Sequence, residues 1–213
     1  GNQEYGGAYV ISRDITERKR LEQQVHQMAY FDALTGLPNR RMLGDRLSQT
    51  MALSKRSGRY AAVMVLDLDN FKPLNDKHGH LVGDMLLIEV ARRLLSCVRA
   101  VDTVARFGGD EFVVILGELD VDRTESRALA QVIAEKILAS LSVPYLLTHR
   151  KDVGTEITVE HHCSASIGAV LFVNHETRHE DILRWADAAM YRAKAAGRNA
   201  IRFYEADGEN SSD

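Results

Sequence analysis

The pattern of apolar and polar residues predicts helices that alternate with strands along most of the chain. Apolar residues three or four positions apart indicate helices at about residues 40–54, 83–98, 122–141 and 179–196. A continuous apolar run from Tyr60 to Leu66 is typical of a buried central strand. Shorter apolar runs predict further strands at residues 145–147, 156–161, 163–172 and 201–204.

The order of these elements favours an α/β (α+β) fold. Strands joined by helices occur beside strands joined by a short hairpin, so we expect a mixed central sheet surrounded by helices. A ferredoxin-like core with additions has this arrangement. The stretch Thr148–His162 is long for a connection between two strands.

Short segments flank the main domain, which we place at residues 31–204. Residues 1–15 are expected to form the terminal strand of a truncated module, because one strand does not fold alone. Residues 16–30 predict an N-terminal helix in which Leu21, Val25 and Met28 share one seam. That seam suits either a coiled coil with a second copy or packing on the domain that follows. Residues 205–213 form a polar tail.

Composition narrows the class of protein. The 213 residues carry a net charge of −3, which gives no support for a general nucleic-acid-binding surface. Cys97 and Cys163 stand far apart in apolar surroundings, so we expect buried thiols in a reducing cytoplasm. No apolar run is long enough for a membrane span. Because the chain starts at Gly1 without an initiator Met, we interpret it as a fragment, and a membrane anchor upstream in the parent protein stays open.

The segment Arg106–Phe112 carries the strongest chemical signal. Gly108 and Gly109 join two apolar runs, which predicts a β-hairpin. Its turn also carries Asp110 and Glu111, which a hairpin does not need for its own stability. Glycine allows a ligand to approach the backbone, and carboxylates suit a hard metal ion. The segment therefore indicates a nucleotide–metal site, with a plain acidic turn as the alternative.

A second pair of carboxylates, Asp67 and Asp69, follows the predicted central strand. Ligands of open α/β sheets bind where strands end. Because side chains alternate along a strand, both aspartates can face the same way. In the alternative arrangement one faces the ligand and the other caps a turn. Asp67 together with Asp110 and Glu111 would make an oxygen-rich site of the kind that Mg²⁺ requires.

Further polar residues have the chemistry to bind a nucleotide. Lys72 suits a phosphate group, and Asn75 and Asp84 carry the donor and acceptor atoms to recognise a guanine edge. Asn75-Asp76 is also typical of a turn, and Asp84 of a helix start. Lys194 and Arg198 end the last predicted helix, where they suit a triphosphate or simply the helix dipole.

Taken together, these motifs resemble the GGDEF family of diguanylate cyclases. The resemblance is carried by the segments Asp67–Lys72, Asn75-Asp76, Gly79-His80, Gly83-Asp84, Arg106–Phe112, Ala165–Gly168 and Asp187–Asn199. Asp32–Arg40 resembles the opening motif of the family, and the match extends over about residues 30–204. Residues 1–24 resemble the last strand of a PAS sensor domain followed by its signalling helix.

The resemblance implies an enzyme with a polymerase-palm-like core that joins two GTP molecules into cyclic di-GMP and releases two pyrophosphates. Each domain holds one GTP, so a homodimer is implied, with Mg²⁺ (or Mn²⁺), two per active site. Asp67, the Leu68 carbonyl and Asp110 would hold metal, with Glu111 close by, and Asp110 and Glu111 are the catalytic candidates. The residues implied for substrate binding are Asn75 and Asp84 for guanine, Lys72, Lys194, Arg198 and the backbone near Asn70 and Phe71 for phosphate, and Gly108 and Gly109 in the turn.

The segment Arg99-Ala100-Val101-Asp102 matches the RxxD site at which the family binds its product as an inhibitor. Arginine recognises both phosphate groups and guanine edges. The alternative is a local ion pair between Arg99 and Asp102 at a helix end.

Other functions stay open at this point. One is a catalytically silent module that binds GTP or cyclic di-GMP and regulates a partner, and another is a cyclase that makes a different cyclic nucleotide. The presence of Asp67, Asp110 and Glu111 argues against the silent module. The sequence does not identify the upstream signal or any phosphodiesterase domain downstream.

Overall fold

The computed structural model of the chain describes residues 17, 21, 25, 27–152, 155–173 and 178–205. Its main sheet has five strands in the order β2-β3-β1-β6-β7. They are β1 (Ala61–Asp69), β2 (Thr103–Gly108), β3 (Glu111–Leu116), β6 (Ser164–Phe172) and β7 (Ile201–Phe203). β6 and β7 pair in parallel and the other neighbours are antiparallel, which confirms the expected mixed sheet.

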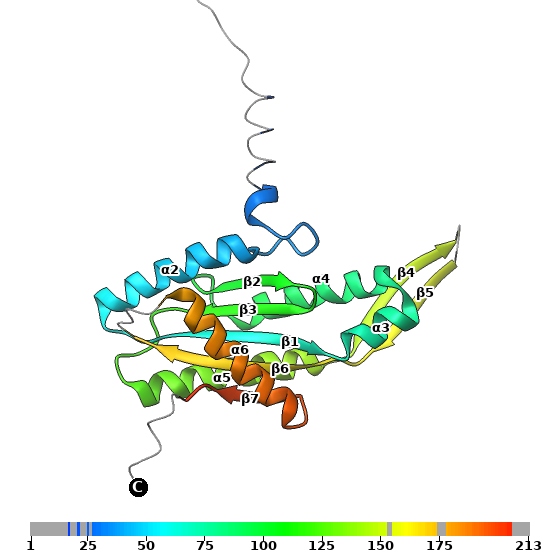
Figure 1. The fold of residues 1–213 in the computed structure, drawn as a ribbon. Coiled ribbons are helices and arrows are strands. Elements are labelled where there is room, and N and C mark those ends of the chain that lie inside the picture. The colour runs from blue at the N-terminus through cyan, green and yellow to red at the C-terminus, as the bar shows by residue number, and fades with distance from the viewer. Residues whose placement is uncertain are drawn as a thin grey trace, which may run out of the picture.

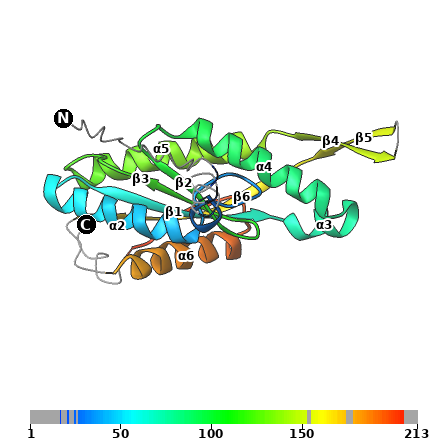
Figure 2. The same ribbon diagram turned by 90° about the horizontal axis from the view of Figure 1, so that it is seen from above.

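Helices cover both faces of this sheet (Figures 1 and 2). α2 (Arg40–Ser57) and α6 (His179–Ala195) lie on one face, and α4 (His80–Cys97) and α5 (Arg123–Ser142) on the other. Alternate residues of β1 join the two cores: Val63 and Val65 pack with α2 and α6, whereas Met64 and Leu66 pack with α4 and α5. This double burial explains the continuous apolar run of the central strand.

The central region differs from the sequence-based expectation at three points. β1 continues past Leu66 to Asp69, because β6 keeps pairing with it as far as Ser164. A short helix, α3 (Phe71–His78), forms where the sequence pattern predicted neither a helix nor a strand. Pro73 is tolerated there because the first helical turn has no N–H bonds to lose. α4 begins at His80 rather than at Gly83, so Asp84 lies inside the helix and does not start it.

The segments before and after the domain are described only in part. Glu17, Leu21, Val25 and residues 27–30 are helical, and the side chains of Leu21, Val25 and Met28 are exposed. The strand expected at residues 1–15 lies outside the described residues, as do residues 206–213. Among the described residues, no helix has the length and apolarity to cross a membrane.

A second, two-stranded sheet consists of β4 (Tyr145–Asp152) and β5 (Thr155–His161). This hairpin accounts for the long stretch Thr148–His162, since β4 extends well beyond the expected residues 145–147. The hairpin reaches away from the main sheet, past α3 and one end of α4 (Figures 1 and 2). Its base joins the core through Tyr145 and Leu147.

α6 packs so closely on β6 that only glycine fits at position 168, and this can be tested. A Cβ atom added there would lie 2.0 Å from the Ala186 carbonyl oxygen and 2.1 Å from the Met190 nitrogen. We expect Gly168→Ala to lower the free energy of unfolding by about 2 kcal/mol or more, because the helix backbone must move. Urea unfolding measures this. Gly117→Ala is the matched control, since its Cβ would meet nothing closer than 3.8 Å. Equal stability of both variants would contradict the packing described here.

Candidate active site

The two aspartates at the end of β1 lie on the sheet face that α2 and α6 cover. They continue the alternation of Val63 and Val65, so both face the same way. Asp67 forms an ion pair with Lys194 of α6, whose Nζ lies 2.8 Å from Asp67 Oδ2. Burial raises the pKa of Asp67, a hydrogen bond from Lys194 opposes this, and the negative charges of Asp110 and Asp69 add to the rise. Asp67 therefore lies at the end of β1 with both a cation and other carboxylates close by.

The Asp69 carboxylate accepts hydrogen bonds from β6 and from the turn after α6. Its Oδ2 accepts hydrogen bonds from the Ser164 hydroxyl at 2.6 Å and the Asn199 N–H at 3.1 Å, and its Oδ1 accepts one from the Ser166 hydroxyl at 2.8 Å. Arg198 and Asn199 have positive φ angles of 64° and 44°. Non-glycine residues keep such angles only where their surroundings hold them. Asp69 thus fixes the turn that carries Arg198.

Glu111 and Asp110 lie beside the end of β1. Glu111 is the pairing partner of Asp67 across the β1–β3 ladder, and the Leu68 N–H donates to the Asp110 carbonyl at 3.3 Å. Burial raises the pKa of Glu111, and the negative charges of Asp67, Asp187 and Asp110 raise it further. The structure therefore brings the carboxylates that the sequence selected on two separate segments to one edge of the sheet.

The donor set of this edge fits a divalent cation. Neighbouring negative charges raise the pKa of Asp67 and of Glu111, and a hard cation with oxygen ligands would stabilise such a cluster. Asp67, Asp110, Glu111 and the Leu68 carbonyl supply oxygen ligands of this kind. Within the described ranges, no three His, Cys, Asp or Glu side chains converge closely enough to form a ready-made metal cluster. The ammonium group of Lys194 instead meets the charge of Asp67.

The turn between β2 and β3 is braced by Arg106. Gly109 has a φ of 52°, which glycine adopts without strain. Nε and one terminal nitrogen of Arg106 donate to the Gly109 carbonyl at 3.0 and 2.7 Å, and the other terminal nitrogen donates to both oxygens of Asp32 at 3.1 Å. The sequence does not reveal that Arg106 and Asp32 together brace this turn, because their contact spans 74 positions of the chain.

Asp32 belongs to the loop that joins the N-terminal helix to α2. Burial alone would raise the pKa of Asp32, but hydrogen bonds from Thr35 and Arg106 together outweigh it and hold the pKa below its usual value. The Arg106 N–H also donates to the Pro38 carbonyl at 3.0 Å. Arg40, which follows this loop, lies over the Phe107 ring at 4.5 Å. The loop and the glycine turn are therefore one connected unit.

Asn75 and Asp84 lie on α3 and α4. Asn75 Oδ1 is buried and has no hydrogen-bond partner among the described residues. An added Cβ at Gly83 would lie 1.9 Å from this oxygen, so only glycine leaves room for the Asn75 carboxamide. Asp84 follows Gly83 directly and is exposed. An unsatisfied buried acceptor costs free energy, and an N–H group of a bound base would satisfy it.

The residues selected for phosphate binding come from two elements near the end of β1. Asn70 has a φ of 62° and turns the chain directly into α3, whose first backbone N–H groups have no helical partners. Lys72 is exposed on the first turn of α3. Lys194 ends α6, and Arg198 is exposed in the turn that Asp69 fixes.

Arg99 and Asp102 form the local pair that the sequence offered as an alternative. Arg99 donates to Asp102 through Nε at 3.1 Å and a terminal nitrogen at 3.0 Å, and that nitrogen also donates to the Gly117 carbonyl at 2.9 Å. The Asp102 side chain has no exposed surface, whereas the Arg99 side chain is 52% exposed. About half of the Arg99 side chain therefore remains accessible to solvent.

Comparison with known proteins identifies a family match over nearly the same residues as the predicted domain. The family model described as diguanylate cyclase, GGDEF domain, matches residues 29–200. The bifunctional diguanylate cyclase/cyclic di-GMP phosphodiesterase MucR of Pseudomonas aeruginosa is 44% identical over 191 residues, which cover 89% of this chain and 26% of MucR. The diguanylate cyclase TpbB of the same species is 38% identical over 180 residues, which cover 84% of this chain and 38% of TpbB. The chain spans about a quarter of the length of the first curated relatives that it matches.

Solved structures agree with this result. The GGDEF domain of TpbB superimposes with a TM-score of 0.69 at 37% identity, over 80% of this chain and 98% of that domain. The coiled coil and GGDEF domain of DgcB from Caulobacter crescentus, solved in complex with cyclic di-GMP, gives a TM-score of 0.73 at 29% identity, over 88% of this chain and 93% of that one. Family, sequence and fold thus coincide over the same residues, and the chain belongs to the GGDEF family of diguanylate cyclase domains.

Proposed function

We propose that this chain condenses two GTP molecules into cyclic di-GMP with release of two pyrophosphates. The observation that carries the proposal is the meeting of Asp67, Glu111 and Lys194 at one edge of the sheet. Carboxylates for metal ions and an ammonium group for phosphate are the parts that nucleotidyl transfer needs. The GGDEF family match and the identity to relatives named diguanylate cyclases support the same activity.

Guanine would lie between α3 and α4. Asn75 Oδ1 accepts from an N–H of the base, and the exposed carboxylate of Asp84 accepts from a neighbouring donor. Guanine presents two such donors on one edge, whereas adenine presents an acceptor at the corresponding ring position. This difference favours GTP over ATP.

The triphosphate would extend from the base toward the start of α3 and the end of α6. Backbone N–H groups near Asn70 and Phe71, together with the side chains of Lys72, Lys194 and Arg198, bind its oxygens. Lys194 would exchange its contact with Asp67 for one with phosphate. Gly108 and Gly109 leave the backbone of the neighbouring turn open to the substrate.

Asp67, the Leu68 carbonyl, Asp110 and Glu111 would hold the two divalent cations, Mg²⁺ or Mn²⁺. When bound, the cations lower the pKa of the attacking ribose 3′-hydroxyl and neutralise charge on the leaving pyrophosphate. Asp110 and Glu111 are the candidates to receive the hydroxyl proton. The lowered pKa of the hydroxyl would let either carboxylate act as the base, although both are weak bases at neutral pH.

One chain offers one such half-site, so the reaction requires two copies that face each other. The exposed side chains of Leu21, Val25 and Met28 on the N-terminal helix suit a parallel helix pair that holds the copies together. Arg99 and Asp102 would bind the product as an inhibitory site, since the Arg99 side chain remains half exposed. The assignment of residues 1–15 to a PAS domain is part of the same proposal.

Removing a central carboxylate tests the enzyme assignment. We expect Asp110→Asn to lower cyclic di-GMP formation by about 100-fold or more, since it loses charge both for the metal ions and for proton transfer. Chromatography and mass spectrometry of the product from GTP and Mg²⁺ measure this. Glu118→Gln, an exposed change after β3, is the control. Activity of Asp110→Asn within tenfold of the unchanged chain would contradict the proposal.

Base recognition is tested at Gly83 and Asn75. We expect Gly83→Ala and Asn75→Ala each to raise KM for GTP about tenfold, because each removes or displaces one buried acceptor. Steady-state kinetics with GTP and ATP separate the base from the phosphates, and the preference for GTP should shrink in both variants. If both variants keep the original KM and preference, the base does not lie between α3 and α4.

The raised pKa of Glu111 predicts a gain in stability when its charge is removed. Since folding raises this pKa above its ordinary value of 4.5, the ionised carboxylate destabilises the fold above that pH. In metal-free buffer we expect Glu111→Gln to unfold at a higher temperature than the unchanged chain at pH 7. The difference should vanish below about pH 4, where both carry a neutral group. A lower midpoint for Glu111→Gln at pH 7 would mean that the carboxylate is stabilised by partners.

A further inference from the structure

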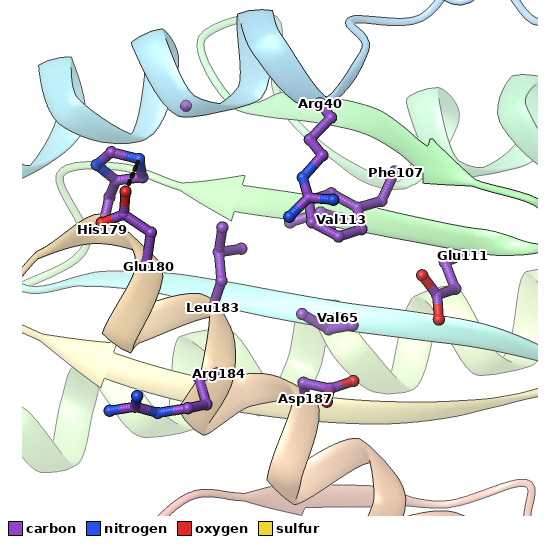
Figure 3. A pocket seen from close by; sticks show the side chains of 11 residues that line it. Arg40, Val65, Phe107, Glu111, Val113, His179, Glu180, Leu183, Arg184 and Asp187 are labelled. Carbon is purple, nitrogen blue, oxygen red and sulfur yellow. Dashed lines mark ion pairs between the residues drawn. The ribbon is translucent and has the colours of Figure 1, made fainter.

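A cavity of about 390 Å³ separates α2 from α6 above β1 and β3. The two helices come close near Gly44, where an added Cβ would lie 3.8 Å from His179 Nε2, and they leave a gap from there toward Glu111 (Figure 3). Pockets of 300–1,000 Å³ are typical of small-molecule sites. The cavity is thus large enough for one compact organic ligand.

This cavity is distinct from the nucleotide site described above. Glu111 lines both, but Asp67, Asp110 and Lys194 do not line the cavity, and neither do Asn75 and Asp84 of the proposed base site. The cavity therefore needs an occupant of its own, and any occupant would touch the active site through one shared carboxylate.

The middle of the cavity is lined by apolar side chains. Val65 and Val113 form its floor on the sheet, and Leu183 of α6 forms one wall. Phe107 lies opposite, with the Arg40 guanidinium group over its ring at 4.5 Å. An apolar slot bounded by an aromatic ring and a planar cation suits a flat aromatic group.

The two ends of the cavity differ in charge. Figure 3 shows Glu111 and Asp187 at one end, with His179 and Glu180 at the other. Asp187 is among the charges that raise the pKa of Glu111. Arg184 pairs with Asp181 at 2.6 Å, and the charge of Lys194 opposes the rise in the Glu111 pKa only in part. In the described part of the chain, no hydrogen bond or ion pair reaches the Asp187 carboxylate, so this end favours hydrogen-bond donors and disfavours anions.

We propose that the cavity between α2 and α6 binds a flat aromatic compound that presents an N–C–N donor edge to Asp187 and Glu111. Amidines carry this edge as cations and aminopurines such as guanine carry it as neutral bases. Two parallel N–H donors match the two oxygens of a carboxylate, while the ring fills the slot beside Leu183. Binding does not depend on the proposed cyclase activity. An occupant that constrains Glu111 would inhibit cyclic di-GMP formation, and this consequence rests on the proposed function.

Binding to the cavity can be tested by nuclear magnetic resonance with benzamidine and 9-methylguanine as probes. The whole chain is used, labelled at its methyl groups and side-chain amides. We expect saturable shifts of the Leu183, Val65 and Val113 methyls, whereas the Asn75 side-chain amide reports separately on the base site. Asp187→Asn should weaken binding about tenfold or more, since it removes a charged acceptor. Leu183→Trp should also weaken it, because the indole fills the slot. Asp45→Asn, on an exposed position of α2, is the matched control.

The two probes distinguish the source of the ligand. Binding of 9-methylguanine points to a guanine nucleotide, and binding of benzamidine alone points to a cationic amidine; both results support the shared donor edge. The proposal fails if neither probe shifts these methyls, or if Asp187→Asn and Leu183→Trp bind as tightly as the unchanged chain. Cyclic di-GMP formation measured on the same samples shows separately whether the proposed function holds.

Discussion

The burial of β1 along its whole length is the constraint on which the rest of the structure depends. A strand that packs on both faces and ends in two aspartates must supply partners for those charges, since an unpaired buried charge is costly. Two serine hydroxyls and one backbone N–H satisfy Asp69, and Lys194 pairs with Asp67. The partner of Asp67 lies at the end of α6, and one partner of Asp69 lies in the turn that follows α6. The same contacts that stabilise the strand therefore place Lys194 beside Asp67 and fix the turn that carries Arg198.

A second set of contacts joins this edge of the sheet to the N-terminal helix. Arg106 holds the Gly109 carbonyl with one side of its guanidinium group and Asp32 with the other. Asn39 in turn donates from its backbone N–H to the Tyr30 carbonyl at 2.9 Å and from its side chain to the Ala29 carbonyl at 3.0 Å. The helix that would carry an upstream signal is thus fastened to the turn that carries Asp110 and Glu111. A signal that reorients two such helices would move the two active-site turns with them.

Much of this could be predicted from the sequence, for identifiable reasons. The long helices and the central strand follow from periodicity. The sequence also singled out Asp67, Glu111 and Lys194, which the structure brings together, by their chemistry. The missed features depend on tertiary contacts. α3 is short and contains Pro73, so its pattern resembles a turn, and the Arg106–Asp32 pair joins residues far apart in the chain. The role of Gly83 becomes visible only when the Asn75 carboxamide packs against it. Asp67 and Asp69 looked equivalent in sequence, and only the structure shows that Asp67 pairs with Lys194 whereas Asp69 accepts hydrogen bonds from Ser164, Ser166 and Asn199.

The most direct test of the central claim is to incubate the chain with GTP and Mg²⁺, at concentrations that favour a dimer, and to identify the products by mass spectrometry. The account predicts cyclic di-GMP and pyrophosphate in a ratio of one to two, with a rate per chain that rises with protein concentration as half-sites pair. GTP that binds to the chain and is recovered unchanged at every concentration would contradict the account and would favour a regulatory nucleotide-binding domain.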